Sequence, residues 1–178
     1  MAYDIEELKG TTGVLTATER KRINDLITRV NSTWSRPPHG YMSFDDESET
    51  PAMSQSDGWT QISNATDDIF CDCDVVGITQ TGDSLVIIAP GDYISICSLS
   101  FSGNNTDSYE FALLKNGEVI GPKIVRTTLA QDTGNVGIPF YAKDLVAGDI
   151  LTLGIRNSAN DNDATLVACS WVVWVLHY

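Results

Sequence analysis

The spacing of apolar residues changes from helical to alternating along this chain. Between residues 16 and 34 apolar positions recur at intervals of three and four, as on one face of a helix: Ile23, Leu26, Ile27, Val30 and Trp34. The preceding Thr16-Ala17-Thr18-Glu19 is a capping-box signature for the start of this helix. The pattern therefore predicts one short helix over residues 16–34 with a single apolar stripe.

A polar stretch follows the predicted helix. Ser35-Arg36-Pro37-Pro38-His39-Gly40 is unfavourable for a helix, and an acidic run from Phe44 to Pro51 continues the polar character to about Gly58. We interpret residues 35–57 as a linker or extended arm. The expected organisation is an N-terminal segment at 1–34, this linker, and a head domain at 58–178.

From Trp59 onward the chain consists of short runs rich in β-branched and aromatic residues, separated by turn residues. The clearest turn is Asn116-Gly117, because both residues tolerate positive φ, and it predicts a hairpin over 108–128. This pattern is typical of an antiparallel β-sandwich. The nine predicted strands lie near 59–63, 69–78, 84–88, 92–101, 108–115, 118–128, 135–142, 149–156 and 164–177.

Alternation within two predicted strands indicates which faces are buried. Over 92–101 one side carries Tyr93, Cys97, Leu99 and Phe101, while the other is polar except for Ile94 and Ile96. The last strand is apolar on both faces from Leu166 to Leu176, so both faces must be covered. We expect the core to cover one face and another subunit to cover the other. The expected subunit interface consists of Trp171, Val173, Trp174, Val175 and Leu176.

Charge is distributed unevenly along the 178 residues. Residues 1–40 contain six Lys or Arg and five Asp or Glu, a net charge of +1, whereas residues 41–178 contain five and nineteen, a net charge of −14. So acidic a body repels nucleic acid and anionic lipid, which argues against either as a partner. The basic side of the predicted helix either meets an acidic partner or is simply its solvated face, the more common case.

The sequence also bears on the cellular compartment. No apolar run is long enough for a membrane span, and residues 1–25 lack the apolar core of a signal peptide, so we expect no secretion by that route. The four cysteines, Cys71, Cys73, Cys97 and Cys169, are then expected to be free and mostly buried thiols.

Residues with candidate chemistry are sparse. Cys71 and Cys73 share one strand face, but no second Cys or His pair stands at zinc-finger spacing, so structural thiols are favoured over a metal site. The two histidines, His39 and His177, have no supporting catalytic motif. Residues 160–163, Asn-Asp-Asn-Asp, offer the oxygen ligands that calcium prefers, but their spacing is not that of an EF-hand, and a solvated turn is favoured. The sequence therefore predicts no catalytic residue, no metal site and no cofactor.

Four stretches carry a family resemblance. They are Pro90-Gly91-Asp92-Tyr93, the apolar run 109–114 followed by Lys-Asn-Gly-Glu at 115–118, the segment 145–153 with Gly148-Asp149, and the aromatic strand 170–176. In this order they resemble the globular head of the complement first-component and tumour necrosis factor superfamily over about residues 84–178. The resemblance implies a ten-strand jelly-roll β-sandwich that assembles as a compact trimer. An all-β, TNF-like jelly roll with a short N-terminal α-helix is thus the expected fold.

The combination of such a head with no collagen-like stem and no signal peptide is most similar to jelly-roll heads on bacteriophage virions. We therefore expect a non-enzymatic, homotrimeric capsid decoration or head-fibre protein, made in the host cytoplasm and displayed on the capsid surface. Its helix stripe, Ile23, Leu26, Ile27, Val30 and Trp34, is expected to bind the capsid or another virion protein. The exposed head then stabilises the particle or adheres to a host-surface glycan. The alternatives are a receptor-binding head at the phage tail, or a calcium-dependent carbohydrate-binding module or small carbohydrate-active enzyme.

Overall fold

The computed structural model describes residues 17–34, 37–49, 58–62, 71–129 and 133–177. The chain divides into two compact units, Met1–Arg36 and Pro37–Tyr178. The first unit contains helix α1 (Ala17–Trp34), which confirms the predicted helix. No helix in the described part of the chain is long and apolar enough to cross a bilayer.

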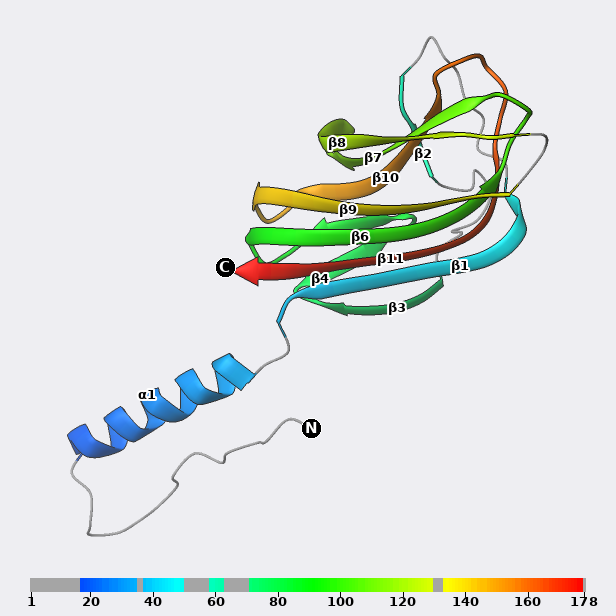
Figure 1. Cartoon of the computed structure of the whole chain (residues 1–178). Helices are drawn as coiled ribbons and strands as arrows, with labels where there is room; N and C mark the ends of the chain where they lie inside the picture. The colour runs from blue at the N-terminus through cyan, green and yellow to red at the C-terminus, as the bar shows by residue number, and fades with distance from the viewer. Residues whose placement is uncertain (1–16, 35–36, 50–57, 63–70, 130–132, 178) are drawn as a thin grey trace. The chain divides into compact units, whose positions relative to one another are not determined.

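The second unit is a sandwich of two antiparallel sheets (Figure 1). One sheet has the strand order β3-β1-β11-β6-β9, and the other has the order β4-β5-β10-β7-β8 with β2 paired to β10. This arrangement confirms the predicted all-β jelly-roll sandwich. The strands are β1 (His39–Glu49), β2 (Thr60–Gln61), β3 (Cys71–Val76), β4 (Ile78–Thr81), β5 (Ser84–Ile87), β6 (Gly91–Ser102), β7 (Ser108–Lys115), β8 (Glu118–Thr127), β9 (Thr133–Leu145), β10 (Ile150–Asn157) and β11 (Thr165–His177).

The core lies between the two sheets and is filled by alternate residues of each strand. At its centre the ring of Phe101 on β6 packs against two rings of β7, with centroids 5.5 Å from Tyr109 and 5.0 Å from Phe111. All three side chains are fully buried. The predicted inward residues of β6 are confirmed, because Tyr93, Cys97, Leu99 and Phe101 are all at most 1% exposed.

The β7–β8 hairpin has the predicted Asn-Gly turn. Asn116 and Gly117 adopt φ values of 52° and 85°, as a two-residue type I′ turn requires. Asp149 anchors this turn, since it accepts hydrogen bonds from Asn116 Nδ2 at 2.9 Å and pairs with Lys115 Nζ at 2.8 Å. Burial alone would raise the pKa of Asp149, but the hydrogen bonds from Lys115, the backbone N–H of Val146 and Asn116 lower it overall.

The predicted linker at 35–57 is wrong for residues 39–49, which form strand β1. This strand lies in the sheet between β3 and β11, and Figure 1 shows it beside β11 along its length. Its inward residues Gly40, Met42 and Phe44 are buried, so β1 contributes to the core. The acidic residues that follow Phe44 suggested a solvated segment. Pairing with β3 from His39 to Ser43 and with β11 as far as Glu49 supplies the hydrogen bonds that hold β1 as a strand.

The strand predicted at 69–78 is also corrected. The chain turns at Gly77, whose φ of 64° interrupts an extended conformation, so that β3 ends at Val76 and β4 begins at Ile78. The two strands belong to different sheets. Together with β1, this division gives eleven strands in the described residues instead of the nine predicted and the ten that the resemblance implied.

Candidate subunit interface

Two neighbouring rows of mostly apolar side chains cross the outer face of the sheet that contains β11. Each row follows the register of the paired strands β1, β11, β6 and β9, and its side chains lie on the face opposite the core. The first row is Trp174, Ile94 and Tyr141, with His39 at its edge, and the second is Tyr41, Val172, Ile96 and Pro139.

These rows leave large apolar side chains in contact with solvent. The exposed fraction is 36% for Trp174, 42% for Ile96 and 48% for Tyr141, and Leu176 beyond the first row is 47% exposed. Scattered exposed apolar residues are ordinary on a monomer, whereas contiguous ones commonly mark a binding surface. We call the two rows together with Leu176 the apolar face.

Polar residues border the apolar face along the same strands. The next row consists of Ser43, Ser170, Ser98 and Gly137. One row further on, Ser100 Oγ donates a hydrogen bond of 2.6 Å to Asn135 Oδ1. The outer surface of a single sheet is therefore divided into an apolar part and a polar part, whereas the inward residues of β6 are apolar except for the buried Ser95.

Tyr141 is held in place at one edge of the apolar face. Its hydroxyl donates a hydrogen bond of 2.7 Å to Asp92 Oδ2, and Asp92 Oδ1 accepts a second bond of 2.8 Å from the backbone N–H of Asp144. The hydrogen bond to the Asp92 carboxylate raises the pKa of Tyr141, because it stabilises the protonated phenol. This link fixes the ring while leaving one side of it available for contact.

The structure divides the five interface residues predicted from the sequence. Trp171 and Val173 are 0% exposed and Val175 is 7% exposed, so their own chain already covers them. Trp171 also donates a hydrogen bond of 2.7 Å from Nε1 to Ser95 Oγ inside the core. The prediction is therefore wrong for these three residues, since a partner subunit cannot reach them. Trp174 and Leu176 lie on the apolar face, and their contact with a partner stays a prediction.

Sequence reasoning missed the residues that complete the apolar face. Ile94 and Ile96 are apolar exceptions on the otherwise polar side of their strand, and this exception is the sequence signal for the apolar face. The register of β6 with β11 supplies their explanation, because Ile94 pairs with Trp174 and Ile96 pairs with Val172. The two isoleucines of β6 and the outward apolar residues of β11 thus form one continuous surface.

The residues predicted to anchor the chain lie on α1 in the other compact unit. Ile23 and Ile27 are half-buried, and Leu26 is 60% exposed. The side chains of Val30 and Trp34 fall outside the described residues. The anchoring role of this stripe therefore stays a prediction.

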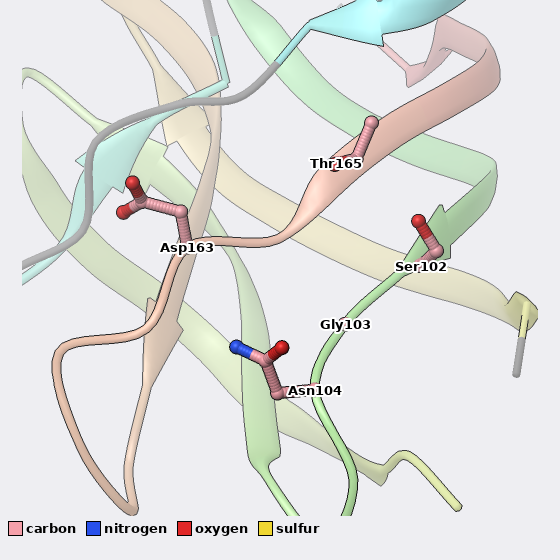
Figure 2. Close-up of a pocket in the computed structure, with 5 residues that line it drawn as sticks. All are labelled: Ser102, Gly103, Asn104, Asp163 and Thr165. Atoms are coloured by element: carbon pink, nitrogen blue, oxygen red, sulfur yellow. The ribbon is translucent and has the colours of Figure 1, made fainter. Parts of the chain in front are cut away.

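A second candidate site is a small polar pocket where β6 ends and β11 begins. Figure 2 shows Ser102, Gly103 and Asn104 on the segment that leaves β6, and Asp163 and Thr165 on the segment that enters β11. Its volume of about 220 Å³ is below the roughly 300–1,000 Å³ of typical small-molecule sites. The pocket could hold at most a small polar group, and the described residues that line it include no recognisable set of catalytic residues.

The amide-rich loop beside this pocket is organised around Asp107. The buried Asp107 carboxylate accepts hydrogen bonds from the side-chain amides of Asn157, Asn160 and Asn162 at 3.3, 2.5 and 3.0 Å. Burial alone would raise the pKa of Asp107, but these hydrogen bonds and one from Tyr109 lower it overall. Among the described residues no group of three or more His, Cys, Asp or Glu side chains is placed to hold a metal ion. The interpretation of residues 160–163 as a solvated turn stays a prediction.

The thiols and histidines take mainly structural positions where the structure describes them. Cys97 and Cys169 are free and buried, as predicted. The side chains of Cys71 and Cys73 fall outside the described residues. His39 Nδ1 lies 2.7 Å from the backbone oxygen of Pro37, within hydrogen-bond distance, at the start of β1.

Comparison with known proteins places the fold of the head. No protein-family model and no curated protein matches this sequence. Among solved structures, murine APRIL at pH 5.0 has a TM-score of 0.54 at 13% identity, covering 77% of this chain and 99% of that one. The globular domain of a zebrafish complement 1qA protein has a TM-score of 0.55 at 9% identity, covering 80% and 98%. At such identities the likeness concerns the fold alone, and the head of this chain therefore has the jelly-roll fold of the tumour necrosis factor and complement 1q heads.

Proposed function

We propose that this chain forms a homotrimeric, non-enzymatic head in which the apolar face is the contact between subunits. The observation that carries the proposal is the continuity of the two apolar rows across β11, β6 and β9. An exposed tryptophan beside an isoleucine and a tyrosine would favour association in water, because contact removes apolar area from solvent.

A trimer is the assembly that the sequence resemblance implies, and the jelly-roll fold agrees with it. Three copies related by a threefold axis close into a ring, so that every copy uses the same surfaces and none is left unpaired. Such a ring also protects the outer face of a sheet that would otherwise promote non-specific association.

The mass of the full chain in solution tests this assembly. Sedimentation equilibrium at micromolar concentration should give three times the chain mass of 19.4 kDa. A dissociation constant of about 100 μM corresponds to a binding free energy of about −5.5 kcal/mol. A chain that is still monomeric at a concentration of about 100 μM would associate more weakly than this, and that result would contradict the trimer.

We further infer that the trimer belongs to a bacteriophage virion, as a capsid decoration or head-fibre protein, with the N-terminal unit as its anchor. The support is the separation of the chain into a helical unit and a head. The net charge of +1 over residues 1–40 against −14 over the rest also suits a division between attachment and display. The head then stabilises the particle or meets a glycan on the host surface.

Two experiments test the virion role. Electron microscopy of virions with the gene deleted should show density lost from the capsid surface, and loss confined to the tail would instead favour the receptor-binding head. Deletion of residues 1–34 should leave a trimer that no longer co-sediments with particles lacking the native protein. The full-length chain is the control, and undiminished binding of the truncated chain would place the attachment surface on the jelly roll.

A further inference from the structure

Two thiols meet in the core on the inner side of the same sheet, behind the polar row of Ser98 and Ser170 that borders the apolar face. Cys97 lies on β6 and Cys169 on β11, and both side chains point inward with exposed fractions of 1% and 4%. In the strand register Cys97 pairs with Trp171 and Cys169 pairs with Leu99, so the two cysteines are diagonal neighbours on one face. Their sulfur atoms are 3.6 Å apart, although 72 positions separate the residues in sequence.

This separation is close to what a covalent bond between the sulfurs needs. A disulfide has an S–S distance of about 2.05 Å, so the atoms would have to approach by roughly 1.6 Å, a movement that side-chain rotation and small strand shifts can share. We propose that Cys97 and Cys169 are a dithiol that oxidises to a disulfide and so staples β6 to β11.

The reaction is thiol–disulfide exchange with a small-molecule disulfide such as oxidised glutathione. The thiolate of one cysteine attacks a glutathione sulfur, forms a mixed disulfide and releases one glutathione thiolate. The second cysteine then loses its proton and attacks the protein sulfur of the mixed disulfide, which releases the second glutathione. Two protein thiols are thereby oxidised while one glutathione disulfide is reduced to two thiols.

The folded core controls when this exchange happens. The hydrogen bond with Cys97 and burial both raise the pKa of Cys169, so the reactive thiolate is scarce in the native chain. Exchange is therefore expected during folding or local opening, and slowly in the closed core. A chain that folds in a reducing compartment keeps the two thiols, and one exposed to an oxidant while folding acquires the staple.

The location gives the staple a structural effect. β6 and β11 are adjacent strands of the sheet, and their opposite faces carry Ile96 and Trp174 of the apolar face. A covalent link between them closes a long segment of chain in the unfolded state, and long loops gain the most from such a link. The oxidised head should therefore resist unfolding better than the reduced head. The disulfide forms within a single chain, so its effect does not depend on the trimer.

The test isolates the pair within the full chain. The double variant Cys71→Ser/Cys73→Ser keeps Cys97 and Cys169 as its remaining cysteines, since the sequence has four. After refolding with oxidised glutathione, denaturation and alkylation, mass spectrometry should show two fewer hydrogens and no alkylated cysteine. The thermal midpoint should rise on the order of 10 °C relative to the reduced protein and return when reductant is added.

The matched control is Cys97→Ala in the same background, whose midpoint should not respond to glutathione in this way. Peptide mapping of the oxidised wild-type chain gives a second measurement if the double variant folds poorly, and it should recover Cys97 and Cys169 in one linked peptide pair. Full alkylation of both cysteines after oxidative refolding would overturn the disulfide. If the Cys97–Cys169 disulfide forms but the thermal midpoint is unchanged or lower, the disulfide does not stabilise the head as proposed.

Discussion

Replacing Trp174 by serine is expected to dissociate the proposed trimer while leaving the head folded. The side chain lies on the apolar face, where Ile94 of β6 and then Tyr141 of β9 follow it in the same row. The inner core is formed by other residues of β11, so the substitution should open no cavity there. The expected result is a monomer with an unchanged fold.

The magnitude follows from the exposed area of the side chain. Trp174 is 36% exposed, and a tryptophan side chain of about 250 Å² then leaves about 90 Å² for a partner to cover. At about 25 cal/mol per Å² this area is worth about 2 kcal/mol per subunit. Three subunits give about 6 kcal/mol per trimer, which corresponds to a weakening of the trimer by about four powers of ten.

Sedimentation velocity over a range of concentrations measures the effect, and far-UV circular dichroism checks the fold. The matched control is Val125→Ser, because Val125 is 58% exposed on β8 in the other sheet and should not alter the mass in solution. If Trp174→Ser stays trimeric at the concentration where the wild type does, the apolar face is not the subunit contact. An equal loss of trimer in Val125→Ser would show that the effect is not specific to that face.

Three further outcomes are expected for single substitutions in the head. Trp171→Ala should lower the free energy of unfolding by about 3–5 kcal/mol in a denaturant titration, because the side chain is 0% exposed, and a loss below 1 kcal/mol would contradict its place in the core. Asp107 has a folded-state pKa below its ordinary value of 3.8, so its contribution to stability is present above that value and is lost as the pH falls through the lowered pKa. Asp107→Ala should therefore reduce stability at pH 7 by about 1–3 kcal/mol and flatten the fall in stability below pH 4, as measured by urea unfolding at several pH values, and an equally steep fall would oppose this. Gly103→Ala should lower the thermal midpoint because the added Cβ would collide with the ring of Tyr109, whereas Gly137→Ala, with no atom within 4 Å of its Cβ, serves as the control.

Local chemistry made part of this protein predictable. The hairpin of β7 and β8 was predicted at nearly its observed bounds because Asn116-Gly117 adopts positive φ values that few other pairs tolerate. The helix at 17–34 was predicted from the spacing of its apolar residues, and the inward side of β6 from simple alternation. In each case the information lies within one helix, one strand or one hairpin.

Strand β1 was missed because its stability is not local. Only Met42 and Phe44 signal an alternating strand, and an acidic run follows them directly. In the folded protein β1 pairs on one side with β11, more than a hundred positions later, and on the other side with β3. A short polar segment becomes a central strand because its neighbours complete its hydrogen bonds, and a sequence pattern does not contain those neighbours.

By itself, the sequence showed that the last strand carries apolar residues on both faces, and from this it predicts a covering for each face. It could not determine which tryptophan belongs to which face, since Trp171 and Trp174 are the same residue type in similar surroundings. The tertiary structure decided this by pairing β11 between β1 and β6 in one register, which turns Trp171 inward onto Ser95 and Trp174 outward beside Ile94. The physical reason is that side chains alternate along a strand, so the register of long-range pairing and the packing of the second sheet fix every inward and outward position at once.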